Sequence, residues 1–266
     1  MPPQFGKMVL AELRAVFGRW SARGALILAV VVALLCVAGL ELVRDQAVNA
    51  QVNNMPVQSM VDMTWRGAAA WTLKARNFFV LPMLLVLATA AAVSGELADH
   101  TLREVMVRPV NRWSVLMAKF IALAVLSAAT LAVSLAVAVM GGAATFGTEG
   151  ELGPVSLGFL ASWGSDLGLL AMTMAVGVFV RNVGGVVVAV ILFLFADWVA
   201  RMLLGLVAMI GLQAASGIAD MLPGAALACW EGWSDGWAWQ PFAGLAALIA
   251  VALAIALGRF QSMDVP

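Results

Sequence analysis

The chain has 266 residues, of which 63% are hydrophobic and only 11% are charged, with 15 basic and 15 acidic side chains. A soluble core of this length could not bury so much apolar surface, and an ordinary soluble domain carries about 25% charged residues. The composition also excludes a disordered chain, and the zero net charge argues against a nucleic-acid partner. Short segments of alternating polarity, typical of a membrane barrel, are missing. We therefore expect an all-α integral membrane protein.

The N-terminal segment predicts an amphipathic helix. Its apolar residues recur at helical spacing and are Phe5, Met8, Val9, Leu13, Val16, Phe17 and Trp20. A basic amphipathic helix that ends in Trp is typical of the membrane–water interface. It can act as an anchor that orients the first span, which is the favoured interpretation, or as an elbow helix that transmits motion from a cytoplasmic partner.

Six segments are long and apolar enough to cross the hydrocarbon core, which takes about 20 residues. The predicted spans are 24–42, 77–95, 116–141, 157–180, 183–209 and 241–258, and the segments outside them include 1–23, 96–115 and 210–240. Pro82 predicts a kink in the second span. The fourth and fifth spans carry charges, so they must face protein or water rather than lipid.

The distribution of Lys and Arg predicts the orientation. With a cytoplasmic N-terminus, the inner side carries Lys7, Arg14, Arg19, Arg23, Arg103, Arg108, Arg112, Lys119, Arg181 and Arg259. The outer side carries only Arg44, Arg66, Lys74 and Arg76. This bias places both termini in the cytoplasm. No cleavage site follows the first apolar run, so we expect an uncleaved first span, and the low basicity of the outer loops favours a bacterial inner membrane.

The inner loop between the second and third spans contains a well-marked short helix. Thr101 and Glu104 have the spacing of a capping box, and Pro109 stops a helix. These signals predict a two-turn helix over 102–108. Asn111 is then the expected N-cap of the third span.

This short helix is predicted to carry an apolar face and an ion pair. Leu102, Val105 and Met106 recur at i, i+3 and i+4, while Glu104 and Arg108 have the favoured i, i+4 polarity. A capped helix of this kind can dock on a partner, or it can be a well-ordered loop on the lipid headgroups. The residues alone leave both interpretations open.

The sulfur-containing residues give no metal site. Met55, Met60 and Met63 in the long polar outer loop could bind Cu(I), but the chain has 15 methionines and packing is the favoured interpretation. Cys36 and Cys229 are expected to be buried small hydrophobes. With one His and no cysteine cluster, we expect no metal bound by this chain.

The segment 210–240 is too short and too interrupted for a further span. Trp230, Trp233 and Trp237 repeat at i, i+3 and i+7, and Trp favours the interface. We expect outer re-entrant or interfacial helices before the last span.

The charges within the fourth and fifth spans are expected to meet. At 1.5 Å rise per residue, Asp166 and Asp197 lie about 22 and 23 Å from the turn near Arg181, and Arg201 lies one turn beyond Asp197. The sequence predicts an intramembrane polar cluster of Asp166, Asp197 and Arg201. It could be a structural ion pair, or a polar element of a transport path or outer gate.

Enzyme motifs are missing or implausible. The sequence has no G-x-x-x-x-G-K-[ST] and no H-E-x-x-H, and the single histidine, His100, is far from Ser165 in the fourth span. An intramembrane aspartyl enzyme could use Asp166 and Asp197. Arg201 argues against it, because it would keep Asp197 charged.

Several of these motifs together resemble the membrane subunit of a bacterial ABC transporter of the ABC-2 permease type. The matching residues after the second span are Gly95-Glu96, Thr101-Leu102-Arg103, Arg108-Pro109-Val110-Asn111-Arg112-Trp113 and Lys119. At the N-terminus, Glu12-Leu13-Arg14 and Arg19-Trp20 are similar to the family's opening, so the resemblance implies an elbow helix whose residues include Glu12, Arg14, Arg19 and Trp20. His100 departs from the usual Gly before Thr101.

The resemblance implies residues 1–266 as a single transmembrane domain, in a dimer of two permease copies. Each copy would dock on a separate ABC ATPase subunit, which binds ATP and Mg, so this chain is not itself an enzyme and binds no cofactor. The segment 102–108 becomes the coupling helix. The residues implied in ATPase coupling are Glu96, Thr101, Leu102, Arg103, Glu104, Val105, Met106, Arg108, Pro109 and Arg112.

The function implied is export of an amphipathic or hydrophobic substrate, as in multidrug-type members. The alternative is a mechanotransmitter that passes motion to a periplasmic partner, as in permeases tied to copper-enzyme maturation. Phe193 to Asp197 and the polar loop 43–76 are similar to the latter branch. The intramembrane aspartyl enzyme is the least favoured function.

Overall fold

The computed structural model describes nine ranges of the chain. They are 4–47, 51–52, 55–56, 62–78, 80–99, 111–148, 153–212, 214–231 and 240–262. Most of the inner-loop prediction, from Thr101 to Pro109, lies outside the described residues, as do Met60 and Trp233 and Trp237.

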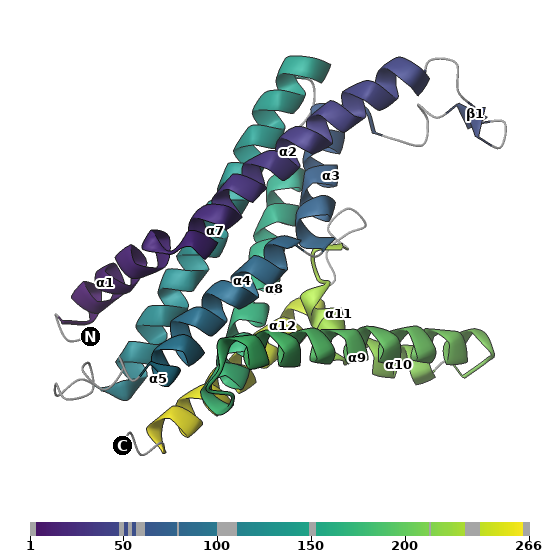
Figure 1. Ribbon diagram of the computed structural model, residues 1–266. Coiled ribbons are helices and arrows are strands. Elements are labelled where there is room, and N and C mark those ends of the chain that lie inside the picture. Colours follow the sequence, from purple (N-terminus) through teal and green to yellow (C-terminus); the bar gives the residue numbers. More distant parts are fainter. Residues whose placement is uncertain are drawn as a thin grey trace.

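Six helices in the described ranges are long and apolar enough to cross a membrane, which confirms the all-α membrane fold. The spans run Trp20–Arg44, Leu81–Ala98, Arg112–Phe146, Val155–Phe179, Val183–Met209 and Phe242–Gln261. They belong to α2 (Trp20–Ala47), α4 (Val80–Ala90) with η2 (Ala91–Gly95) and α5 (Glu96–Ala98), α7 (Arg112–Phe146), α8 (Gly153–Phe179), α9 (Val183–Met209) and α12 (Gln240–Gln261). Figure 1 shows both termini and α5 toward the same end of the molecule.

Local signals explain where the helices begin and end. The Asn111 side chain accepts a hydrogen bond from the backbone N–H of Trp113 at 3.1 Å, so the predicted N-cap of the third span is confirmed. Asn182 caps α9 in the same way, through Gly184 N at 2.9 Å. Gly147, at φ +89°, lies in the left-handed region that terminates α7.

The predicted N-terminal amphipathic segment is helix α1 (Gln4–Gly18). Its apolar face packs on the bundle: Val16 is buried in a cluster with Leu85, Leu123 and Leu170, and Leu13 packs against that cluster. Helix α1 is therefore attached to the transmembrane helices along this face.

A buried helix stands where the sequence predicted a polar outer loop. Helix α3 (Trp65–Phe78) precedes α4, and Trp65 and Leu73 pack with Leu131 and Phe159 of α7 and α8. The Thr64 hydroxyl accepts from Gly67 N at 3.3 Å and helps to begin the helix. The assignment of residues 65–76 to a long polar loop was wrong, because they belong to this helix. The only strands in the described ranges form the two-residue pair β1 (Gln51–Val52) and β2 (Met55–Pro56).

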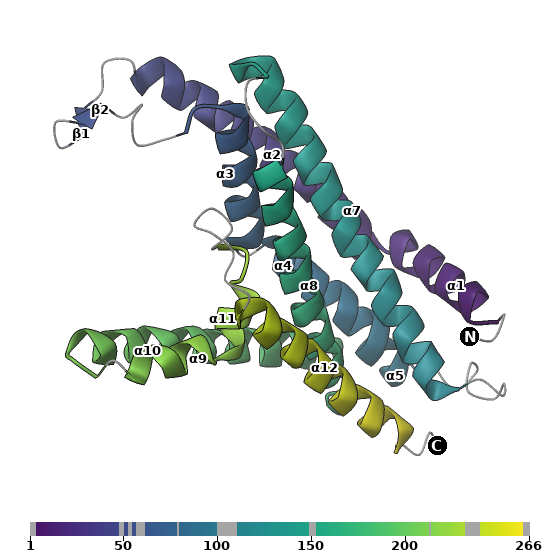
Figure 2. The same cartoon turned by 180° about the vertical axis from the view of Figure 1, so that it is seen from behind.

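The fourth and fifth spans do not form a closed hairpin. Both views show α9 crossing α8 steeply and extending away from the bundle (Figures 1 and 2). Two short helices, α10 (Ala214–Asp220) and α11 (Pro223–Leu227), follow α9 and agree with the short helices expected before the last span. Helix α11 lies between α8 and α9, since it is hydrogen-bonded to both at its opposite ends.

Candidate functional site

Three groups of polar side chains interrupt the apolar bundle, and each joins elements that are distant in sequence. We call them the Lys119 network, the Arg76 site and the Asp197 site. The Lys119 network consists of Glu12, Arg19, Glu96 and Lys119. The Arg76 site consists of Arg76, Asn77, Ser127, Thr130, Ser162 and Asp166. The Asp197 site consists of Asp197, Arg201 and Gly224.

The Lys119 network connects α1 to both sides of the inner loop. Lys119, only 2% exposed, donates to Glu12 of α1 at 2.9 and 3.0 Å and to Glu96 of α5 at 2.6 Å. The other oxygen of Glu96 accepts from Arg19 at 2.7 Å. Glu96 begins the chain segment that leads into the loop, and Lys119 lies in the first turns of the helix that leaves it. The network therefore ties the loop's two ends to α1.

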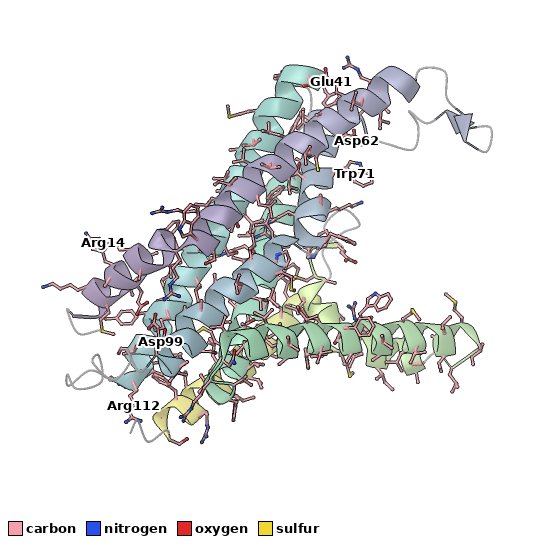
Figure 3. All side chains as sticks on the ribbon, viewed as in Figure 1. Arg14, Glu41, Asp62, Trp71, Asp99 and Arg112 are labelled. Carbon is pink, nitrogen blue, oxygen red and sulfur yellow. The ribbon has the colours of Figure 1, made fainter. Side chains whose placement is uncertain are left out.

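Arg112, at the other end of the loop, holds the last span. Its guanidinium donates to the carbonyl oxygens of Phe260 at 3.5 Å and Gln261 at 3.1 Å, at the C-terminal end of α12. A cation is favourable there because of the helix dipole. Asp99 and Arg112, which flank the undescribed part of the loop, lie toward one end of the bundle (Figure 3).

The remaining predicted elbow residues make no comparable contact in the described ranges. Arg14 is exposed on α1, where Figure 3 labels it, and Trp20 is 83% exposed. Of the four elbow residues, the structure brings Glu12 and Arg19 into the network.

The Arg76 site is a fully buried ion pair that the sequence did not reveal. The Arg76 side chain has no exposed surface, and it binds Asp166 through Nη1 to Oδ1 at 3.2 Å and Nη2 to Oδ2 at 2.5 Å. Ser127 donates to the same carboxylate, and Thr130 accepts from Nη2 at 3.2 Å. Such two-point contacts are among the strongest hydrogen-bonded pairs in proteins.

One signal could have located Arg76. It lies 11 residues after Trp65 and four after Thr72, which places all three on one face of a helix. The side chains of that face are buried. A basic residue in phase with an apolar helix face needs an acidic partner, and the sequence already predicted Asp166 to lie in a span.

The predicted cluster of Asp166, Asp197 and Arg201 is wrong in one member. Asp197 does pair with Arg201, at 2.9 Å, but its other oxygen accepts from the backbone N–H of Gly224 at 2.9 Å. Asp166 is bound by Arg76 instead. The two acids are kept apart because α9 diverges from α8 and α11 occupies the space between them.

The Asp197 site requires glycine at position 224. A Cβ atom there would overlap the Asp197 carboxylate and would lie 2.8 Å from Arg201 Nη2. At the opposite end of α11, the Ser165 hydroxyl donates to the carbonyl oxygen of Leu227. These contacts hold α11 against both neighbouring spans.

In the described part of the chain, no group of three or more His, Cys, Asp or Glu side chains could hold a metal ion. The two carboxylates that an aspartyl enzyme would use belong to separate sites. Both cysteines are free, with Cys229 buried and Cys36 half-buried. Burial raises the pKa of the Cys229 thiol to about 11.

Comparison with known protein families identifies the chain at family level. The family described as ABC-2 family transporter protein matches residues 21–199, which reach from the first span into the fifth. No curated protein matches the chain. The chain belongs to the ABC-2 transporter family, and it is a multi-pass membrane permease subunit of an ABC transporter, a class of subunit that generally pairs with an ABC ATPase and is not itself catalytic.

Proposed function

We propose that this permease exports an amphipathic or hydrophobic substrate, driven by a separate ABC ATPase that docks on the loop 96–115. The dimer would contain two permease copies in a bacterial inner membrane, with both termini and the loop in the cytoplasm. ATP and Mg would bind to the ATPase subunits. The lack of a phosphate-binding motif in this chain fits that division of labour.

The observation that supports this proposal best is the Lys119 network. A loop that receives force must be rigidly connected to the helices that it moves. Glu96 and Lys119, on either side of the loop, share charge-assisted hydrogen bonds with α1, and Lys119 is buried. A push on the loop would therefore move α1 and α7 together rather than bend a free hairpin. This favours the elbow interpretation of α1 over that of a simple anchor.

The test begins with the full chain, purified through an affinity tag from its native membrane. We expect an ABC ATPase subunit to co-purify. In the reconstituted complex, Glu96→Gln should leave ATP hydrolysis measurable but reduce substrate-dependent transport, because the link from the loop to Arg19 and Lys119 is weakened. Glu41→Gln is the matched control, since Glu41 is exposed near the C-terminal end of α2, away from the Lys119 network at its N-terminal end (Figure 3).

Two results would contradict the proposal. One is a permease that never associates with an ATPase, and the other is an equal effect of both substitutions. The same complex separates export from the mechanotransmitter alternative. A mechanotransmitter would hydrolyse ATP and lose partner binding when the segment between α2 and α3 is shortened, but it would move no solute across the membrane.

A further inference from the structure

The Arg76 site has more hydrogen-bond donors than acceptors. Arg76 Nη1 donates to Asn77 Oδ1 at 2.7 Å, and the Ser162 hydroxyl donates to the same oxygen at 3.0 Å. Within the described ranges, the amide nitrogen of Asn77 and the Nε of Arg76 are both buried and have no hydrogen-bond partner. The same holds for the Ser134 hydroxyl, one turn beyond Thr130 on α7. Three N–H bonds of Arg76 and Asn77 therefore meet no acceptor among the residues that the structure describes.

This imbalance is energetically costly for a purely structural contact. A buried donor without a partner costs about 1–3 kcal/mol. A buried ion pair is often no more stabilising than apolar side chains of the same size. Helices α3, α7 and α8 already pack through an apolar cluster that includes Trp65, Leu131 and Phe159. Helix packing alone does not explain why the pair and its unpartnered donors are present.

The charges of the site define the chemistry of a fitting ligand. Arg76 is already neutralised by Asp166, so an anion or a cation would leave an uncompensated charge among transmembrane helices. A ligand that only donates would leave the unpartnered N–H groups unsatisfied. An uncharged oxygen acceptor, such as a carbonyl, fits both constraints.

We propose that the Arg76 site recognises an uncharged hydrogen-bond acceptor on the transported amphiphile, through Arg76 Nε and Asn77 Nδ2. The proposal rests on the proposed export function and specifies its substrate class. The site lies where α3 ends at Phe78 and α4 begins at Val80. Discontinuous helices are a common location for binding sites in membrane transporters.

The test measures binding to the full chain in lipid nanodiscs, without an ATPase. The probe is N,N-dimethyldodecanamide, which carries one acceptor carbonyl and no donor. Controls of equal chain length are dodecyltrimethylammonium, which is charged, and dodecane, which has no acceptor. Saturable binding to the native state raises the midpoint of thermal unfolding in a concentration-dependent way. We expect this saturable shift with the amide only.

Asn77→Ala removes two of the three unpartnered N–H bonds and keeps the ion pair. We expect it to weaken the apparent affinity for the amide about tenfold, as for the loss of one hydrogen bond. Ser165→Ala, next to Asp166 on α8 but hydrogen-bonded to Leu227, should leave the affinity unchanged. The double variant Arg76→Met/Asp166→Leu should abolish the saturable shift.

Several outcomes would overturn the proposal. These are equal shifts for the amide and dodecane, an unchanged affinity in Asn77→Ala, and no saturable shift at all, which would mean that the site holds only water. If the double variant fails to fold, the affinity of Asn77→Ala for the amide still tests the proposal. Because no ATPase is present, failure here is distinguishable from failure of ATPase co-purification, which tests the export function.

Discussion

The stability of the Lys119 network can be measured, and Lys119→Met is the most informative perturbation. Lys119 Nζ lies 2.9 Å from Glu12 Oε1 and 2.6 Å from Glu96 Oε2, so the two carboxylates lie within about 6 Å of each other. Without the ammonium group they repel. At an effective dielectric constant of about 20, that repulsion is on the order of 3 kcal/mol.

The exposure of the carboxylates lowers this figure. The side chains of Glu12 and Glu96 are 20% and 24% exposed, so water screens part of the repulsion, and Glu96 keeps its contact with Arg19. Removing one partner of a fully buried pair costs about 3–5 kcal/mol. We therefore expect Lys119→Met to lower the free energy of unfolding by about 2–3 kcal/mol.

The assay is reversible unfolding in mixed micelles, with a double-mutant cycle. In the Glu12→Gln background Lys119→Met should cost about 1 kcal/mol less than in the wild type, because there the repulsion between the carboxylates is absent. Lys7→Met, at an exposed position on α1, is the control and should change stability by less than about 0.5 kcal/mol. The reasoning is refuted if Lys119→Met resembles this control, or if its cost is the same in both backgrounds.

Two further predictions concern the region between the fifth and sixth spans. Gly224→Ala should displace the Asp197 carboxylate and lower the free energy of unfolding by about 2 kcal/mol in the same assay. Gly217→Ala is the control and should lower it far less, because a Cβ there meets nothing within 4 Å. Equal losses of stability would refute the role of the Asp197 site. Because the pKa of Cys229 is raised to about 11, its thiol is almost fully protonated at pH 8, and iodoacetamide should label it only after unfolding. Mass spectrometry checks this, and rapid labelling of the folded protein at Cys229 would contradict it.

The spans could be predicted from the sequence because their signal is local. A run of about 20 apolar residues is specified by composition alone, and a cap such as Asn111 is specified by its immediate neighbours. The predicted bounds of the fifth span, 183–209, coincide with those of α9. The agreement at 183 follows from Asn182, which separates the apolar runs of the fourth and fifth spans and caps α9.

The polar sites could not be predicted in full because pairing depends on helix crossing. The partner of Asp197 four residues along the same helix was found, since its position needs no tertiary information. The partner of Asp166 was missed, because it comes from a helix 90 residues away and because counting basic residues by loop assigned Arg76 to the surface. Helix α11 is hydrogen-bonded to both α8 and α9, and its sequence carries no signal of where it packs.

Helix α3 and the second span, which follow each other in the chain, lie between the Arg76 site and the Lys119 network. Arg76 and Glu96 are 20 residues apart in the sequence, and between them η2 is a π-helix, an irregularity that is often found at functional sites. A displacement of Glu96 would meet η2 first, before it could reach either polar site. Absorption of this displacement at η2 is opposed by close packing: the Ser94 hydroxyl donates to the carbonyl oxygen of Gly177 at 3.0 Å, and a Cβ at Gly177 would lie only 2.9 Å from that hydroxyl. Helix α8, which carries Asp166, is thereby attached to η2. A force on Glu96 would therefore reach the Asp166 side of the buried ion pair through η2 and α8.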